Sequence, residues 1–271
     1  MSKEAPISNS VRVLAVALCA VGTATIALFL WARSPATVER DAAPRAAMDG
    51  GARAAAMPAP VRGNGTILGE VVLAGAPPQM QPLKLGADPI CAGASSRDEQ
   101  VIATDGKLEN VFVRITDAPA EPPRSEPVVI DQVSCVFRPR VQGAIRGQMM
   151  QIRNGDQTLH NVHGYAGTST LFNYAQPATA PPVERGFPEG ARVIKLKCDV
   201  HPWMTAYVLV TDNSYFAVSG RDGSFSIRGI PAGSYHLEAW HERFGLKTAK
   251  VTLSEGETAR VAFSYAPGDR G

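Results

Sequence analysis

The chain carries little net charge, since 27 Lys and Arg stand against 25 Asp and Glu for a formal charge of +2. It has no basic run interleaved with aromatic residues, which argues against nucleic acid as a partner. Downstream of residue 62 no stretch shows convincing helical periodicity. What is present instead is 25 Gly and 21 Pro spread among short Val- and Ile-rich runs. This texture is typical of an all-β protein, and 271 residues allow one or two domains.

The N-terminal region contains an uncharged apolar run at residues 13–32, long enough to cross a bilayer as a helix. We predict a single-pass signal anchor there, with 1–12 in the cytoplasm. A cleaved signal peptide is the alternative, but its apolar core would be shorter and no small-x-small cleavage site follows directly. Residues 33–62 have almost no large apolar side chains and are interpreted as a disordered linker with a reach of about 30 Å. The soluble domains are then expected to face the periplasm or cell exterior of a bacterium, tethered to its inner membrane.

The most informative motif is a loop with the spacing C-x2-H-x2-M, formed by Cys198, His201 and Met204. About forty residues upstream, His160 and His163 offer a second imidazole. Two His, one Cys and a weak axial Met are the ligand set of a blue-copper electron-transfer centre. The motif therefore predicts one type 1 copper ion as the cofactor.

Three cysteines lie outside the predicted anchor: Cys91, Cys135 and Cys198. An odd number in an exported protein leaves one thiol over. If Cys198 is a metal ligand, Cys91 and Cys135 are free to form a disulfide in an oxidising compartment. The alternatives are two unpaired buried thiols, or a Cys91–Cys198 bridge that would rule out the copper site.

Short strands separated by turn residues are expected throughout the rest of the chain. Alternation over 192–198 places Ile194, Leu196 and Cys198 on one face, so the thiol should point inward at the end of a strand. We divide this part into a β segment at 63–125, a second unit at 126–212 and a third at 213–267.

The stretch from Val128 to Val210 resembles the cupredoxins, Greek-key β-sandwiches, and its metal loop is most similar to that of amicyanin. That loop has the same Cys-x2-His-Pro-aromatic-Met form, and the upstream ligand lies in a matching His-Asn-Val-His. The resemblance implies four copper ligands: His160, Cys198, His201 and Met204. It also implies that Asn161 joins the two ligand loops and is the candidate donor to the sulfur. His201 would present a ring edge through an apolar patch bordered by Pro202 and Trp203, while His163 is not a ligand.

The C-terminal part, above all 222–227 and 231–235, resembles carboxypeptidase regulatory-like domains. These are small transthyretin-like β-sandwiches without catalysis of their own. Their usual opening Gly-x-Val strand occurs far upstream, at Gly69 to Leu73. We therefore expect the early strands of this domain within 63–125, with the cupredoxin inserted into it. The combination is similar to exported bacterial proteins described as methylamine-utilisation or plastocyanin-like.

The expected function is a membrane-tethered, non-enzymatic carrier of single electrons between unidentified redox proteins. A copper-delivery protein would have a more exposed site rich in Met or His. A structural module would have lost a ligand. A thiol enzyme would use Cys198 as nucleophile with His201 and Asp199, but this needs an accessible thiolate, and the residue is expected to point inward.

Overall fold

A computed structural model describes residues 62–86 and 88–271, all within one compact unit that spans 55–271. The predicted N-terminus, anchor and linker lie outside the described residues, except for Arg62. Within the described part, no helix is long and apolar enough to cross a membrane. The only helix there is a single 3-10 turn, η1 at Cys91–Gly93, so the predicted all-β class is confirmed for these residues.

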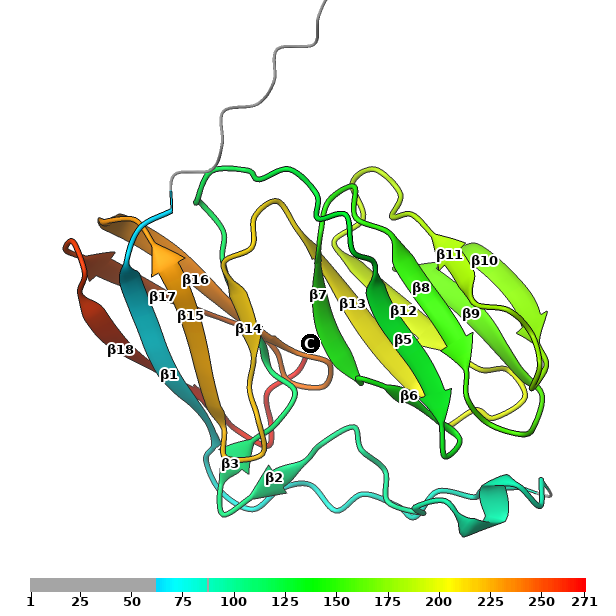
Figure 1. Cartoon of the computed structure of the whole chain (residues 1–271). Helices are drawn as coiled ribbons and strands as arrows, with labels where there is room; N and C mark the ends of the chain where they lie inside the picture. The colour runs from blue at the N-terminus through cyan, green and yellow to red at the C-terminus, as the bar shows by residue number, and fades with distance from the viewer. Residues whose placement is uncertain (1–61, 87) are drawn as a thin grey trace, which may run out of the picture. The chain divides into compact units, whose positions relative to one another are not determined.

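The strands between residues 128 and 211 form one sandwich, which we call the central sandwich (Figure 1). One sheet has the order β10-β9-β12-β13-β7 and the other has the order β11-β8-β5-β6. The nine strands are β5 (Val128–Val133), β6 (Val136–Arg138), β7 (Val141–Ile145), β8 (Met150–Asn154), β9 (His160–Ala166), β10 (Ser169–Gln176), β11 (Val183–Arg185), β12 (Val193–Lys197) and β13 (Thr205–Thr211).

Strands from both sides of this stretch form a second sandwich, which we call the split sandwich. Its strands are β1 (Gly65–Leu73), β2 (Ala103–Thr104), β3 (Lys107–Leu108), β4 (Phe112–Ile115), β14 (Phe216–Val218), β15 (Ser224–Ile230), β16 (Gly233–His241), β17 (Gly245–Leu253) and β18 (Thr258–Tyr265). β1 pairs with β15 and β18, and β4 pairs with β14 and β16. Both sheets therefore combine strands that precede and follow the central sandwich, while the domain boundaries given above remain predictions.

Each sandwich has its own apolar core, built from the inward side chains of alternating strands. The core of the central sandwich contains Cys198 and Met204, both fully buried. A third cluster joins the two sandwiches around Phe112 and Tyr207. At this junction a Cβ on Gly143 would lie 2.4 Å from the ring of Phe216, so only glycine lets β7 approach so closely.

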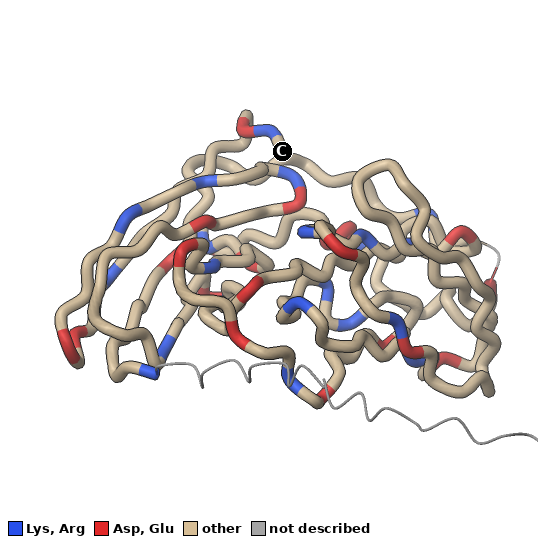
Figure 2. The backbone as a smooth tube through the Cα atoms, turned by 90° about the horizontal axis from the view of Figure 1, so that it is seen from above, with Lys and Arg blue, Asp and Glu red and all other residues tan. Residues whose placement is uncertain are grey.

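An ion pair between the two sandwiches lies close to the same junction. The Arg140 guanidinium donates to both carboxylate oxygens of Glu242 at 2.6 and 3.0 Å, and the two side chains are only 9% and 3% exposed. The sequence alone indicates no role for Arg140. Elsewhere, acidic and basic residues are scattered over the described backbone (Figure 2).

Candidate metal centre

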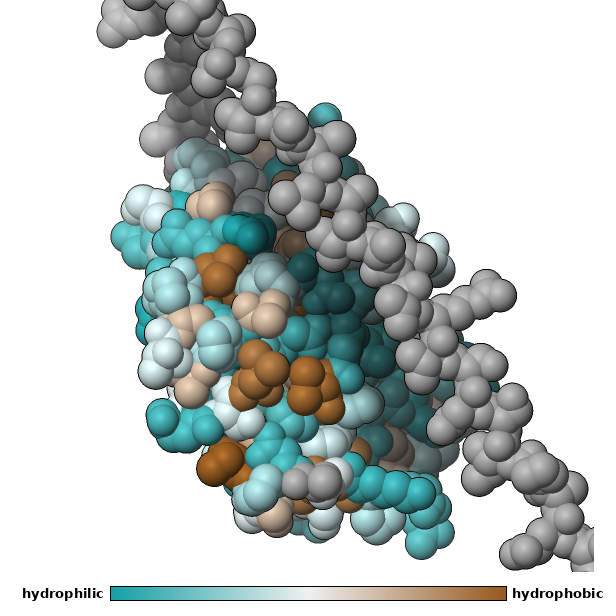
Figure 3. Space-filling view, turned by 90° about the vertical axis from the view of Figure 1, so that its right-hand side faces the viewer, coloured by the Kyte–Doolittle hydropathy of each residue, from teal (hydrophilic) through white to brown (hydrophobic). Residues whose placement is uncertain are grey.

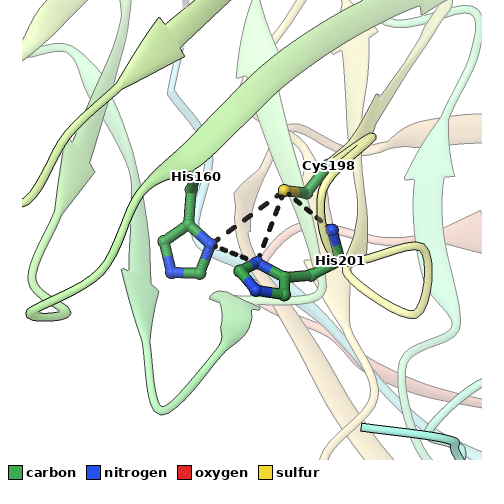
Figure 4. Close-up of side chains that lie close together, drawn as sticks. All are labelled: His160, Cys198 and His201. Atoms are coloured by element: carbon green, nitrogen blue, oxygen red, sulfur yellow. Dashed lines mark hydrogen bonds between the residues drawn. The ribbon is translucent and has the colours of Figure 1, made fainter. Parts of the chain in front are cut away.

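Three of the four predicted ligands converge inside the central sandwich (Figure 4). His160 opens β9, and Cys198 and His201 lie in the loop between β12 and β13. The Nδ1 atoms of the two histidines are 2.9 Å apart, and Cys198 Sγ lies 4.0 and 3.8 Å from them. His160 and Cys198 are fully buried and His201 is 2% exposed. Two imidazole nitrogens and one sulfur thus face a common point.

The local fold follows from the strand that leads into the loop. Ile194, Leu196 and Cys198 are all buried, so the predicted alternation of β12 is confirmed and carries the thiol into the core. β12 pairs with both β9 and β13, which brings the start of β9 beside the loop. Within the loop the His201 amide donates to Cys198 Sγ at 3.4 Å. The backbone of the loop therefore turns around the Cys198 sulfur and donates a hydrogen bond to it.

In both histidines the outer ring nitrogen, Nε2, which points away from the Cys198 sulfur, contacts a carboxylate. Asp156 Oδ2 lies 2.9 Å from His160 Nε2, and Asp88 Oδ2 lies 3.2 Å from His201 Nε2. An ionised carboxylate only accepts hydrogen bonds, so each Nε2 carries the proton of its ring. Burial lowers the pKa of His160, although Asp156 opposes this, and a hydrogen bond from Thr158 lowers the pKa of Asp88. The structure thus favours ionised Asp88 and neutral His160.

With an N–H of each ring on its outer side, the two rings turn their inner nitrogens toward one another. The Nδ1 atoms of His160 and His201 face each other across 2.9 Å, beside the Cys198 sulfur. A neutral His160 offers a lone pair at Nδ1 and no proton. A cation between the three atoms could be bound by all of them.

The distances suit a single ion. For zinc, the bonds are about 2.0 Å to imidazole nitrogen and about 2.3 Å to thiolate, so a nitrogen and a sulfur bound to one ion lie at most about 4.3 Å apart. The separations of 2.9, 3.8 and 4.0 Å all fall within that limit. The donor set is soft thiolate plus imidazole, which suits copper. These residues therefore fit the metal that the sequence predicts.

Met204, the predicted axial ligand, is fully buried in the same core as Cys198. Its amide donates to the His201 carbonyl at 2.9 Å, and its carbonyl accepts from the Cys198 amide at 3.4 Å. The loop therefore closes on itself at Met204, while its role as a ligand remains a prediction.

Asn161 links the two ligand segments. Its side-chain oxygen accepts from the Asp199 amide at 2.5 Å, and its backbone amide donates toward Cys198 Sγ at 3.5 Å. The contact to sulfur thus comes from the backbone of Asn161 and not from its side chain. His163 lies 3.0 Å from Asp199 and is held outside the group of donor atoms.

The expected exposed edge of His201 is absent. Its Nε2 faces Asp88 and, at 3.6 Å, Cys91 Sγ, so a segment distant in sequence covers the ring. Trp203 packs against the His201 ring with 5.1 Å between centroids and donates Nε1–H to the Cys135 carbonyl, while Pro202 is exposed. The expectation failed because the resemblance concerned 128–210 alone and contained no covering segment.

Exposed apolar side chains occur next to site residues in the sequence. Ile90, Leu159 and Val200 are each about half exposed and adjoin Cys91, His160 and His201 in sequence. In the view of Figure 3, hydrophobic residues lie singly or in small groups among hydrophilic ones.

The disulfide between Cys91 and Cys135 is present, as the cysteine count led us to expect, and Cys198 is the free thiol of the described residues. Sequence reasoning missed Asp88 and Asp156. Asp156 lies four residues before His160, a spacing that could have signalled it, whereas Asp88 is 113 residues from its partner His201 and left no local signal.

Comparisons with known proteins agree with parts of this picture. The family model for the carboxypeptidase regulatory-like domain matches residues 200–266, well under half of the chain. That match begins inside the ligand loop, upstream of the predicted start at 213. No curated protein matches the chain.

Similar solved structures include several cupredoxins. A purple cupredoxin from Nitrosopumilus maritimus is 23% identical with a TM-score of 0.28, covering 31% of this chain and 99% of its own. A reduced amicyanin variant is 22% identical with a TM-score of 0.29, covering 36% and 97%. A copper-containing nitrite reductase from Thermus scotoductus is 16% identical with a TM-score of 0.29, covering 37% and 26%.

Proposed function

We propose that this protein is a type 1 copper protein that carries single electrons. The observation that carries the proposal is the convergence of the Nδ1 atoms of His160 and His201 beside the Cys198 sulfur, all within 4.0 Å of one another. Two imidazole nitrogens and one sulfur at these distances can bind one cation.

A bound copper ion would supply the redox chemistry, by cycling between Cu(II) and Cu(I). The residues of this chain hold the donor atoms still. His160 is fixed by Asp156, His201 by Asp88, and Cys198 by two backbone amides. Donors fixed before the metal arrives need little rearrangement when its charge changes, which favours fast electron exchange.

Burial of the site separates this function from the alternatives. A delivery protein must release its metal to a partner, but the three donor residues here are at most 2% exposed. A thiol enzyme needs a thiolate that reaches substrate, and Cys198 is fully buried. A purely structural module gives no reason for two imidazole nitrogens and a thiol to converge in its core. Electron transfer needs no direct access to the metal and fits best.

We further propose that the chain is tethered by residues 13–32 to a bacterial inner membrane and exchanges electrons there with periplasmic or surface redox proteins. The split sandwich is proposed to be a regulatory-like, transthyretin-like domain into which the central, cupredoxin-like sandwich is inserted. The shared sheets of β1 with β18 and β4 with β16 support this arrangement.

Titration of the metal-free protein with Cu(II) tests the proposal. We expect an intense visible absorption from thiolate-to-copper charge transfer that saturates at one equivalent. Cys198→Ser should bind copper without that colour and far more weakly. A colourless wild-type complex, or equal copper affinity of the variant, would rule the proposal out.

A further inference from the structure

The residue that covers His201 lies on a segment that belongs to neither sheet of the central sandwich. Residues 74–102 connect β1 to β2 of the split sandwich, and we call the described part of this connection the arm. The arm reaches across to the metal centre and places Asp88 Oδ2 at 3.2 Å from His201 Nε2. A carboxylate from one sandwich thus contacts a ligand of the other.

Hydrogen bonds to several other residues also hold Asp88. Its Oδ2 accepts the Thr158 hydroxyl at 2.6 Å, and its Oδ1 accepts the Ile90 amide at 2.9 Å. Its backbone carbonyl accepts the amides of Cys91 and Ala92 at 3.1 Å each. The carboxylate therefore has a fixed place beside the ring.

The disulfide connects the arm that carries Asp88 to the turn that holds Asp156, the carboxylate beside His160. Cys91 of the arm is bonded to Cys135, which lies in the two-residue turn between β5 and β6. Both turn residues have positive φ, Ser134 at 54° and Cys135 at 57°, and their amides donate to Asp156 at 2.6 and 2.8 Å. Asp156 in turn contacts His160. The disulfide thus links the segments that position Asp88 and Asp156, the carboxylates beside the two histidines.

We propose that Asp88 is a positioning residue that tunes the copper centre, and that the disulfide keeps it in place. This inference rests on the proposed function. By accepting the Nε2 proton of His201, Asp88 fixes the ring with Nδ1 toward Cys198 and makes that nitrogen a stronger donor. Its negative charge beside the ring stabilises Cu(II) more than Cu(I). Both effects lower the reduction potential.

Asp88→Asn tests this directly, because it removes the charge at nearly constant size. In the full-length protein the visible absorption should remain, while Cu(II) affinity should fall by about 10–100-fold. Cu(I) affinity should fall less, so the reduction potential should rise by about 59 mV for each tenfold difference between the two losses. Asp88→Glu, which keeps the charge, should shift the potential less than Asp88→Asn.

Asp212→Asn is the matched control. Asp212 follows the far end of β13 and pairs with Arg146, so the same change of charge there should leave the potential nearly unchanged. A coloured Asp88→Asn protein whose potential matches that of wild type or of the control would overturn the inference. A wild-type protein that forms no coloured complex would instead overturn the proposed function.

A second measurement needs no variant. In wild-type protein labelled with ¹⁵N and loaded with Cu(I), Nε2 of His201 should carry a proton that exchanges slowly with water, since Asp88 accepts it. An Nε2 without a proton, or one in fast exchange, would show that Asp88 only anchors the arm.

Discussion

Both sandwiches bury histidine side chains, but His241 in one and His160 in the other meet different partners. In the split sandwich, His241 is 1% exposed and its Nδ1 accepts the amides of Arg243 and Phe244 at 3.1 and 3.4 Å. Its ring stacks on Phe244 with 4.8 Å between centroids. In the central sandwich, His160 Nδ1 faces only another imidazole and a sulfur. The Nδ1 atom of His241 thus meets two backbone donors, whereas that of His160 meets another metal-binding type of side chain.

This difference shows that burial alone does not identify a metal ligand. Burial lowers the pKa of both rings, for His241 to about 4, with the positive charges of Arg140 and Arg243 contributing. The distinguishing feature is what the inner nitrogen meets: two backbone donors at His241, and none at His160. A ring nitrogen directed at a second imidazole and a sulfur marks the site.

The largest expected effect comes from removing one histidine from each sandwich. His160→Ala should abolish the visible copper absorption and lower Cu(II) affinity by more than about 100-fold, since losing even an outer partner costs about 10–100-fold. His241→Asn keeps an oxygen that can accept the Arg243 amide and should leave both properties unchanged. Absorption titration measures the two variants side by side, and a loss of colour in His241→Asn would undo the comparison.

The next largest effect is expected from the buried ion pair near the junction of the sandwiches. Arg140→Met leaves the buried Glu242 carboxylate unpaired and should destabilise the protein by about 3–5 kcal/mol in chemical denaturation. The double variant with Glu242→Leu should recover most of this loss, because no buried charge is then left alone. If the double variant is as unstable as the single one, the pair does not act as a unit.

The pH dependence of the free energy of unfolding should reveal the lowered pKa of His241. Its pKa of about 4 lies below the ordinary 6.5, so the unfolded chain takes up a proton first as the pH falls. The contribution of His241 to the free energy of unfolding is fully present above pH 6.5. It declines by about 1.4 kcal/mol per pH unit down to about pH 4 and is constant below that, which amounts to about 3 kcal/mol in total. Denaturation midpoints of metal-free protein between pH 7 and 4 should show this slope, reduced in His241→Asn. Equal slopes in both would contradict it.

The smallest effect concerns the close approach of β7 at the junction. Gly143→Ala places a methyl group 2.4 Å from the Phe216 ring and 2.7 Å from the Phe112 ring, which should cost about 1–3 kcal/mol. Gly93→Ala is the control, because a Cβ there meets nothing within 4 Å. Thermal unfolding of the two variants measures the difference, and equal melting temperatures would mean that the junction adapts freely.

The sequence predicted the features that depend on local pattern. Alternation along 192–198 indicated the inward thiol, the Cys-x2-His-x2-Met spacing indicated the loop, and the cysteine count indicated the disulfide. Each of these follows from residues close in the chain or from simple counting.

The features that were missed depend on contacts between distant segments. Asp88 reaches His201 across 113 residues, and Arg140 reaches Glu242 across 102. Neither pair has a periodicity or spacing that a single sequence displays. The buried edge of His201 was missed for the same reason, since the arm that covers it precedes the stretch that resembled a known family.

The central claim is that His160, Cys198 and His201 bind one copper ion in a site whose shape does not depend on the charge of the metal. X-ray absorption at the copper edge, on protein loaded with one equivalent and measured in both oxidation states, tests this most directly. We predict two nitrogen neighbours and one sulfur neighbour in each state, with nearly the same distances. A spectrum without the sulfur, or one in which a ligand is lost on reduction, would contradict the account.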